Sequence, residues 1–545
     1  MKDVSIPRLS LCVFGAFFFV YTLTSSPVAP LVGDGSVMAS DAVHLLRSGF
    51  SEPEGFSKFG LGQALIDVPI APLVSLMRTT PSPLRRLFLT LAISMLPSLI
   101  GSGICALFFL CCTELGYRRV ASVLGTVLLG LTSMQWVYAQ SLFAEPTIGL
   151  LWLGALYCVL RSRRPAAHVL WLVLAGSLCA YSVLVKPTAA VGLLVFGVYV
   201  VADQWGRRRS LRSSLAGPAV VGFLAPAIPV LALFFWFNSV RYGHMLNMGY
   251  STGRDVSFGF STPLLTGLYG LLFSSGKGLF WYNPTLFLAV FGVPVFARRH
   301  PRAAWLSAGL WVGVLLLHSR WWAWHGDWSW GPRFLVPLLP FGFLPAASLA
   351  DRFLGASGVG WGNRVRIGLS VVLCAIGLWV QGVGLCIPYH NHILVVVQGA
   401  RVFEQPLYDA AKWPIRDDML QVRFIPEFSP IAGHWWLLRC TLGRDRASEA
   451  HVPVPPPWAA LNPKWDVKGI AGFLHYNIWW MLCWQQRADL SGKVWLAPIL
   501  VVFLLAGFAA CAVCVVYLLR SSPPAGDERD GGEVDSALPA GSPSE

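Results

Sequence analysis

Long apolar stretches recur along almost the whole chain, and they constrain its fold more than any other feature. Of the 545 residues, 55% are hydrophobic and only 12% are charged, which leaves too few charges to coat a water-soluble globule. A helix needs roughly 20 apolar residues to cross a hydrocarbon core about 30 Å thick. About twelve stretches qualify, near residues 10–29, 88–112, 120–138, 145–160, 169–185, 189–203, 215–237, 279–297, 303–317, 334–350, 367–386 and 495–519. The sequence therefore predicts an all-α polytopic membrane protein.

The net charge of +14 is concentrated in alternate loops between these stretches. Arginines cluster within residues 118–119, 161–164, 207–212, 298–302 and 352–366, and at 520. Because cytoplasmic loops carry an excess of Lys and Arg, we expect both termini to be cytoplasmic and the intervening loops to face outward. Arg85 and Arg86 break this pattern. We explain them by amphipathic pieces over residues 62–87 that lie along the outer membrane interface.

The loop lengths predict four regions. Residues 1–386 form a transmembrane catalytic region whose first outward loop covers 30–87, and residues 387–494 form a small irregular extracytoplasmic domain with a proline-rich stretch. A last transmembrane helix follows at 495–519, and residues 520–545, rich in Pro, Gly, Ser and acidic residues, form a disordered cytoplasmic tail. One pair among Cys386, Cys440 and Cys483 can oxidise on the outward side, and the sequence does not say which.

The acidic residue Asp34 follows the first apolar stretch within Leu31-Val-Gly-Asp-Gly-Ser36, so its carboxylate lies at the mouth of the membrane. Most acids at a membrane boundary are solvated loop residues, which is the plain interpretation. The functional interpretation is that Asp34 is a catalytic base, and other residues on the same face favour it.

Several ionisable residues lie at the outward ends of the predicted spans, where packing of the helices brings their loops around one cavity. They are Asp34, Asp41, Glu145, Lys186, Lys277 and Arg333. The pattern suits sugar transfer from a phosphate-bearing lipid. A carboxylate takes the proton of an attacking hydroxyl, while Lys or Arg compensates the charge that grows on the departing phosphate.

Three of these residues also have structural interpretations. Lys186 sits where a long cation can extend to the lipid headgroups, and Glu145 precedes a proline at a helix start, where the helix dipole favours a carboxylate. Lys277 lies in Ser274-Ser-Gly-Lys-Gly278, which lacks the spacing of a nucleotide-binding P-loop. We therefore assign Lys277 to substrate binding and reject an ATP site.

Residues 318–333 combine five tryptophans with His318, His325, Asp327 and Arg333. Indole rings stack on sugars, but they also form interfacial belts in membrane proteins. Because charged residues alternate with the tryptophans, we favour a substrate-facing loop that includes His325 and Asp327. The two histidines and Asp327 permit a metal site without matching a recognised ligand pattern, so we assign no metal ligand and no cofactor, and leave a divalent cation open.

Short motifs over residues 10–350 carry a resemblance to a known superfamily. They are Gly33-Asp34-Gly35, Lys58-Phe-Gly-Leu-Gly-Gln63, Glu145-Pro146, Lys186-Pro187, Arg241-Tyr-Gly243, Lys277-Gly-Leu-Phe280 and Gly331-Pro-Arg-Phe334. In this order they resemble bacterial membrane glycosyltransferases of the GT-C superfamily, nearest to protein O-mannosyltransferases and lipid A aminoarabinose transferases. The resemblance implies a GT-C-like bundle, a polyprenyl-phosphate sugar donor and an inverting transfer with Asp34 as the catalytic acid. Mannosyltransferases place two adjacent acids there, whereas this chain has Gly35, so Asp41 and Glu145 are candidates for the second acid.

Three hypotheses follow. The first is a hexosyl- or pentosyltransferase of the bacterial inner membrane, whose outward-facing site moves a sugar to an envelope glycan, lipid or protein, with the bilayer and no nucleic acid as further partner. The second is a transporter or flippase of a lipid-linked saccharide, which needs ionisable residues deep within its spans, and the apolar stretches are nearly free of them. The third is a scaffold or polymerase subunit whose site has decayed.

Overall fold

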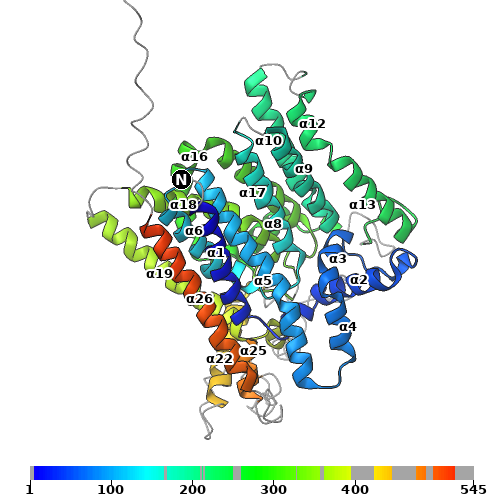
Figure 1. Cartoon of the computed structure of the whole chain (residues 1–545), viewed down its shortest axis with the longest axis vertical. Coiled ribbons are helices and arrows are strands. Elements are labelled where there is room, and N and C mark those ends of the chain that lie inside the picture. The colour runs from blue at the N-terminus through cyan, green and yellow to red at the C-terminus, as the bar shows by residue number, and fades with distance from the viewer. Residues whose placement is uncertain are drawn as a thin grey trace, which may run out of the picture.

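The chain is built from helices throughout the part that its computed structural model describes (Figure 1). That part comprises residues 5–164, 168–208, 212, 215–249, 259–326, 328–355, 361–393, 423–444, 474–486 and 495–521. Within these ranges there are helices, turns and bends, and no strand. Nine helical segments among them are long and apolar enough to cross a membrane. The prediction of an all-α multi-pass membrane protein is confirmed.

The nine segments involve one or two helices each. They are Ile6–Leu23 in α1 (Ser5–Leu23), Leu61–Thr79 over α3 (Leu61–Asp67) and α4 (Ala71–Thr79), α5 (Pro83–Glu114), α9 (His168–Val185), Pro187–Gly206 with α10 (Ala190–Arg208), Pro218–Tyr242 with α12 (Pro218–Leu224) and α13 (Ala227–Tyr242), Arg333–Leu354 with α18 (Leu339–Leu354), Arg364–Cys386 in α19 (Trp361–Cys386), and α26 (Leu496–Arg520).

Four of the predicted stretches fall on helices that are not among these nine segments. They are α6 (Arg119–Thr132), α8 (Ala144–Arg161), α16 (Leu286–Arg299) and α17 (Pro301–Arg320). The helix α8 lies between other helices, and most of its side chains are buried.

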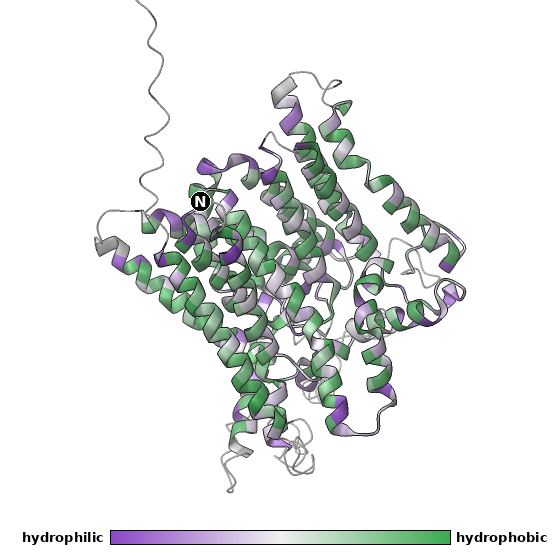
Figure 2. Cartoon of the chain, in the orientation of Figure 1, coloured by the Kyte–Doolittle hydropathy of each residue, from purple (hydrophilic) through white to green (hydrophobic). Residues whose placement is uncertain are grey.

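The outer helices expose apolar side chains, as lipid contact requires (Figure 2). In α26, Val502 and Phe503 are 65% and 63% exposed. The opposite face of α26 packs closely along α1, beside which it runs in Figure 1. A Cβ atom on Gly507 would lie 2.5 Å from the ring of Phe19, so glycine permits this close helix contact.

The first outward loop folds into helices of its own. After α2 (Asp34–Ser48), α3 and α4 follow, and α4 lies beside the first part of α5 (Figure 1). The 32 residues of α5 extend for about 48 Å, longer than the hydrocarbon core is thick. Its first turn, with Arg85 and Arg86, can therefore reach the headgroups. The amphipathic pieces predicted at 62–87 form helices, and the segment Leu61–Thr79 among them is apolar enough to span a membrane.

The basic loops gather at one end of the bundle, where ion pairs join them. Glu114 contacts Arg161 and Arg164 at 2.9 and 2.8 Å, and Arg302 contacts Asp203 at 2.7 Å. The helix α8 runs from Glu145 to Arg161 over 18 residues, a rise of about 27 Å or one hydrocarbon thickness. Glu145 therefore lies at the opposite end of the bundle from the basic loops.

Parts of the predicted extracytoplasmic domain pack against the bundle. In this region the structure describes 423–444 with α22 (Pro430–Arg444) and 474–486 with α25 (Trp479–Gln485). The backbone N–H of Asn477 donates to the carbonyl of Cys386, and that of Trp479 donates to the carbonyl of Ser25. A separate domain over 387–494 stays a prediction, and residues 522–545 of the predicted tail lie outside the described ranges.

The cysteine prediction is not realised in this structure. Cys386, Cys440 and Cys483 are all free thiols, so none of the three pairs is formed. Cys440 and Cys483 are buried on α22 and α25, where they act as small apolar side chains.

Candidate active site

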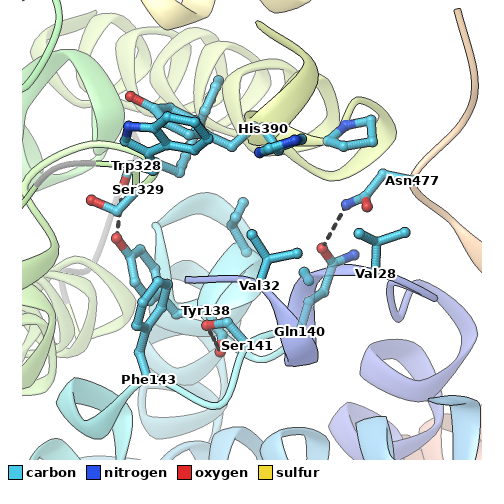
Figure 3. A pocket seen from close by; sticks show the side chains of 16 residues that line it. Val28, Val32, Tyr138, Gln140, Ser141, Phe143, Trp328, Ser329, His390 and Asn477 are labelled. Carbon is cyan, nitrogen blue, oxygen red and sulfur yellow. Dashed lines mark hydrogen bonds between the residues drawn. The ribbon is translucent and has the colours of Figure 1, made fainter. Parts of the chain in front are cut away.

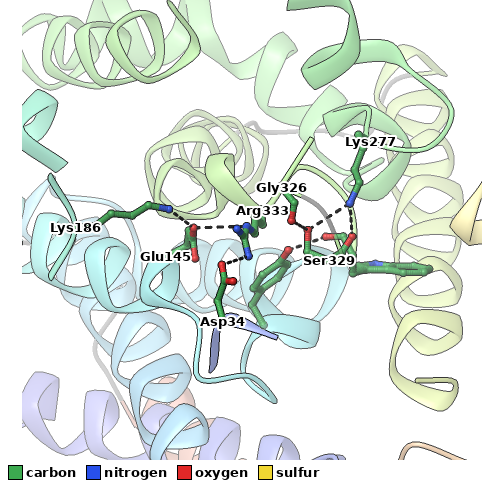
Figure 4. A network of polar contacts seen from close by, with 9 residues as sticks. Asp34, Glu145, Lys186, Lys277, Gly326, Ser329 and Arg333 are labelled. Atoms are coloured by element: carbon green, nitrogen blue, oxygen red, sulfur yellow. Dashed lines mark hydrogen bonds and ion pairs between the residues drawn. The ribbon is translucent and has the colours of Figure 1, made fainter. Parts of the chain in front are cut away.

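Two acidic and two cationic side chains from four distant parts of the chain meet at the end of the bundle opposite the basic loops (Figure 4). Arg333 Nη1 lies 2.7 Å from Asp34 Oδ2, and Lys186 Nζ lies 2.7 Å from Glu145 Oε1. Arg333 Nε is 3.9 Å from the same Glu145 oxygen, so Arg333 joins the two pairs. We call these four residues the charge cluster.

The acids of the charge cluster each begin a helix. Asp34 is the first residue of α2, after Gly33 with a φ of +59°, a left-handed conformation that glycine adopts without strain. Glu145 lies in the first turn of α8, as the sequence predicts, where the helix dipole favours a carboxylate. The capping interpretation of Glu145 and its place in the site are therefore compatible.

The two cationic side chains of the charge cluster lie at the starts of short 3₁₀ helices. Lys186 connects α9 to Pro187–Ala189, and Arg333 begins Arg333–Leu338. Lys186 Nζ lies 4.5 Å from the centre of the Phe334 ring, a cation–π distance. The Lys186 side chain is only 16% exposed, so it turns into the site instead of extending to the headgroups.

Access to the charge cluster is uneven. The side chain of Asp34 is 33% exposed, whereas those of Arg333 and Glu145 are 11% and 4% exposed. The carboxylate of Asp34 is thus the group that an entering molecule reaches most easily. The less exposed guanidinium of Arg333 pairs with this carboxylate and fixes its position.

A pocket opens directly beside the charge cluster. Asp34, Glu145 and Lys186 line it together with Lys58, Phe59 and Gly60. Lys58 was not among the candidate residues from the sequence, although it stands in the Lys58–Gln63 motif that carries part of the resemblance. That motif was the available signal for Lys58, and the three-dimensional fold shows its proximity to Lys186.

The turn that carries Lys58 is held by side chains from two helices. Asp41 on α2 accepts hydrogen bonds from the backbone N–H of Ser57 at 2.9 Å and from its hydroxyl at 2.5 Å. Arg241 on α13 donates to the carbonyls of Ser57 and Phe59 at 2.6 and 2.9 Å. Burial raises the pKa of Asp41 above its ordinary value of 3.8, while the hydrogen bonds from Ser57 oppose that rise. The structure places Asp41 as a support of this turn.

A second, largely apolar pocket continues from Glu145 and Lys186. Its walls include Trp152, Val314, His318, Phe334 and Pro337. His318 is buried, its ring stacks on Phe334 with centroids 4.6 Å apart, and its Nδ1 lies 3.1 Å from the carbonyl of Val314. We call this space the apolar pocket.

Two of the remaining candidates are buried, Lys277 and, in the tryptophan-rich loop, His325. Lys277 is 1% exposed, and its ammonium donates to the carbonyl of Ser329 at 2.5 Å and to its hydroxyl at 3.3 Å. His325 is buried with its ring against Trp324. Asp327 lies outside the described residues. In the described part of the chain, no group of three or more His, Cys, Asp or Glu side chains is placed to hold a metal ion.

The structure gives a physical reason for Gly35, where mannosyltransferases have a second adjacent acid. A Cβ atom at position 35 would lie 2.9 Å from the carbonyl oxygen of Pro30 and 3.4 Å from the Cβ of Leu142. Backbone therefore occupies the space that a side chain would need. Of the two candidates for a second acid, Glu145 lies in the charge cluster and Asp41 contacts the neighbouring turn.

Comparisons with known proteins give similarity in structure only. No protein-family model matches the sequence, and no curated protein matches it. Apo ArnT from Cupriavidus metallidurans aligns over 94% of this chain and 76% of its own, with 15% identity and a TM-score of 0.42. The structure of that ArnT bound to undecaprenyl phosphate aligns over 94% and 77%, with 16% identity and a TM-score of 0.41.

An oligosaccharyltransferase from Archaeoglobus fulgidus, tethered to an acceptor peptide, aligns over 78% of this chain and 62% of its own, with 14% identity and a TM-score of 0.40. ArnT is a lipid A aminoarabinose transferase, and both proteins are GT-C glycosyltransferases, the superfamily that the motifs of this chain resemble. Identity is low in every case, so we infer the function of this chain from the residues of its own site.

Proposed function

We propose that this chain is a membrane glycosyltransferase that moves one sugar from a polyprenyl-phosphate donor to an acceptor hydroxyl. The observation that carries the proposal is the charge cluster, in which the exposed carboxylate of Asp34 is fixed by Arg333 beside a pocket containing Lys58 and Lys186. A base for the acceptor and cations for the phosphate thus stand on one small surface. Sugar transfer in one displacement requires both.

The charges of the site suit a phosphodiester donor. Three cations, Lys58, Lys186 and Arg333, surround the two carboxylates of Asp34 and Glu145, which leaves one positive charge in excess. A polyprenyl-phosphate sugar carries one negative charge, so the loaded site is neutral. A charge taken out of water is tolerated only when it is compensated in this way.

The apolar pocket suits the polyprenyl chain. It starts at Lys186, which we assign to the donor phosphate, and is then lined by Trp152, Val314 and Phe334. A lipid whose phosphate sits at Lys186 buries the first part of its hydrocarbon chain there. A soluble nucleotide sugar would gain nothing from these walls.

In the proposed reaction Asp34 acts as the general base. Its carboxylate takes the proton of the acceptor hydroxyl while the acceptor oxygen bonds to the anomeric carbon of the sugar. The bond between that carbon and the phosphate oxygen breaks, and polyprenyl phosphate leaves with a second negative charge. Lys58 and Lys186 stabilise that charge, which is larger in the transition state than in the donor. One displacement inverts the anomeric centre.

The proposed location follows from the charges at the two ends of the bundle. The arginine-rich end faces the cytoplasm by the positive-inside rule, so the charge cluster faces the outside of a bacterial inner membrane. Both termini are then cytoplasmic. Hexosyl and pentosyl donors both satisfy the chemistry above, and the acceptor belongs to the cell envelope.

The experiment compares purified full-length chain in nanodiscs with its Asp34→Asn variant, offered polyprenyl-phosphate hexoses and pentoses with envelope extracts as acceptors. Release of polyprenyl phosphate is measured. We expect turnover to fall at least about a hundredfold, since the variant keeps the size of the side chain and loses the base. The matched control is Asp203→Asn, which changes a carboxylate at the opposite end and should keep full turnover.

Two results count against the proposal. Equal turnover by native chain and Asp34→Asn would move the base to another acid, with Glu145 the nearest candidate. Donor binding without turnover in any mixture would instead favour a transporter or flippase of lipid-linked saccharides.

A further inference from the structure

An aromatic pocket adjoins the charge cluster and is not used by the donor in the mechanism above (Figure 3). Its walls include Trp328, Trp330, Tyr138, Tyr389 and His390, with the side-chain amides of Gln140 and Asn477 at one edge. In Figure 3 Trp328 and His390 lie on one side of the space, and Tyr138 and Gln140 on the other.

The aromatic pocket shares a wall with the charge cluster. Val32 and Phe143 line the pocket, and each stands two residues before an acid of the cluster, Asp34 and Glu145. The guanidinium carbon of Arg333 lies 5.1 Å from the centre of the Phe143 ring. A molecule in the aromatic pocket therefore lies next to the proposed base without occupying the donor phosphate site.

The lining of the aromatic pocket is largely apolar, with a few polar side chains and no charged one among its described residues. Among its described lining residues there is no Lys, Arg, Asp or Glu, in contrast to the pocket beside Lys58. An anionic headgroup would lose its water here and find no cation in the lining itself, which is unfavourable. A neutral polyol gains hydrogen bonds from amides, hydroxyls and imidazole instead.

The amide edge is held in a fixed orientation. Ser26 Oγ donates to Asn477 Oδ1 at 2.6 Å, and Asn477 Nδ2 donates to the carbonyl of Leu385 at 3.2 Å and to Gln140 Oε1 at 3.3 Å. Gln140 Nε2 in turn donates to the carbonyl of Thr24. Amides fixed in this way offer their remaining capacity to a ligand without further loss of entropy.

The indole of Trp328 provides an apolar platform at the opposite edge. It is 43% exposed, and the ring of His390 supports it with centroids 5.1 Å apart. A large exposed aromatic face opposite a row of amides suits a sugar ring, which has C–H groups on its faces and hydroxyls around its edge.

We propose that the aromatic pocket is the acceptor site and that the acceptor is an uncharged glycan. The role of this glycan as acceptor rests on the proposed function. The binding of a neutral glycan by the pocket does not depend on it. Among the envelope acceptors considered above, the uncharged lining favours a carbohydrate chain over an anionic lipid. The glycan hydroxyl that lies toward Asp34 is the one that receives the sugar.

The test is saturation-transfer difference NMR on the full chain in nanodiscs, with neutral hexasaccharides of glucose, mannose, galactose and arabinose as probes. We expect at least one probe to bind, and Trp328→Ala to weaken its binding about tenfold through loss of ring contact. Trp328→Tyr keeps an aromatic face and should restore most of the affinity. The matched control is Trp322→Ala, because Trp322 is 39% exposed in the same loop and does not line the pocket.

Release of polyprenyl phosphate is measured on the same samples, so that the two proposals fail separately. Donor turnover without binding of any neutral glycan overturns the acceptor class and leaves the transferase standing. Glycan binding that depends on Trp328, in a chain that never turns over donor, supports the pocket and overturns the transferase. Equal glycan binding in Trp328→Ala and Trp322→Ala, or binding of an anionic lipid that depends on Trp328, overturns this inference.

Discussion

Ion pairs occur at both ends of the bundle, but the described pairs differ in one respect: at the site end one acid, Asp34, is more exposed than its partner cation. At the basic end Arg164 and Arg302 are 58% and 56% exposed, while their partners Glu114 and Asp203 are 14% and 13% exposed. The acids there are shielded anchors, and the cations extend outward. This arrangement suits a surface that meets anionic lipid headgroups.

At the site end the Asp34–Arg333 pair reverses this order, whereas the Glu145–Lys186 pair keeps it, with side chains 4% and 16% exposed. Asp34 is 33% exposed, while its partner Arg333 is 11% exposed. An exposed carboxylate held by a shielded cation is a poor anchor for headgroups, and it is a suitable acceptor for a proton from an incoming hydroxyl. The side-chain exposures thus distinguish the Asp34–Arg333 pair from the pairs at the basic end.

Breaking the pair of Glu145 and Lys186 at the site end should have the largest effect. Glu145→Gln leaves Lys186 and Arg333 with one carboxylate between them, and removal of one partner from a buried pair costs about 3–5 kcal/mol. We expect the variant to unfold at a clearly lower temperature in detergent and to lose donor turnover. Thermal unfolding followed by circular dichroism measures the first effect.

The double variant Glu145→Gln with Lys186→Met separates stability from function. Loss of both charges removes the unpaired cation, so we expect most of the thermal stability to return while turnover stays low, since Lys186 no longer meets the donor phosphate. Recovery of turnover along with stability would mean that the pair only supports the fold.

The sequence predicted the ends of the helices far better than their lateral arrangement. Hydropathy and arginine positions sufficed to place Asp34, Glu145, Lys186 and Arg333 at one end, since each is adjacent to a strongly apolar stretch. Which of the residues at that end touch one another depends on how the helices pack. Linear patterns do not encode that packing, so Lys58 was missed.

The same limit explains Asp41 and Lys277. Both lie in outward segments, yet Asp41 binds a turn and Lys277 is buried against Ser329.

Breaking an anchor at the basic end should affect stability without function. Asp351 is 6% exposed, accepts from the backbone N–H of Arg118 at 2.8 Å, and pairs with Arg299. Asp351→Asn keeps the shape and loses charge-assisted hydrogen bonds, so we expect about 1–3 kcal/mol less stability. Turnover per folded molecule should equal that of the native chain. A drop in the intrinsic turnover would show that the two ends are coupled.

The first outward loop gives a pH test. Burial raises the pKa of Asp41, so the folded chain holds this proton more tightly than the unfolded chain. Its contribution to stability is therefore present below pH 3.8 and is lost as pH rises through the raised pKa. We expect Asp41→Asn to remove this part of the pH dependence. The unfolding temperatures of the native chain and the variant should be equal below pH 3.8. At higher pH they should separate, with the variant unfolding at the higher temperature. A constant difference between the two chains at all pH values would contradict this.

The smallest effect should come from an exposed pair at the basic end. Arg302 is 56% exposed and contacts Asp203 at 2.7 Å, and exposed pairs contribute about 0–1 kcal/mol, less in high salt. We expect Arg302→Ala to shift the unfolding temperature slightly at low ionic strength and not at all in molar salt. Glu145→Gln should keep its full effect in both, because salt screens shielded pairs far less. Equal salt sensitivity of the two variants would remove the contrast between the ends.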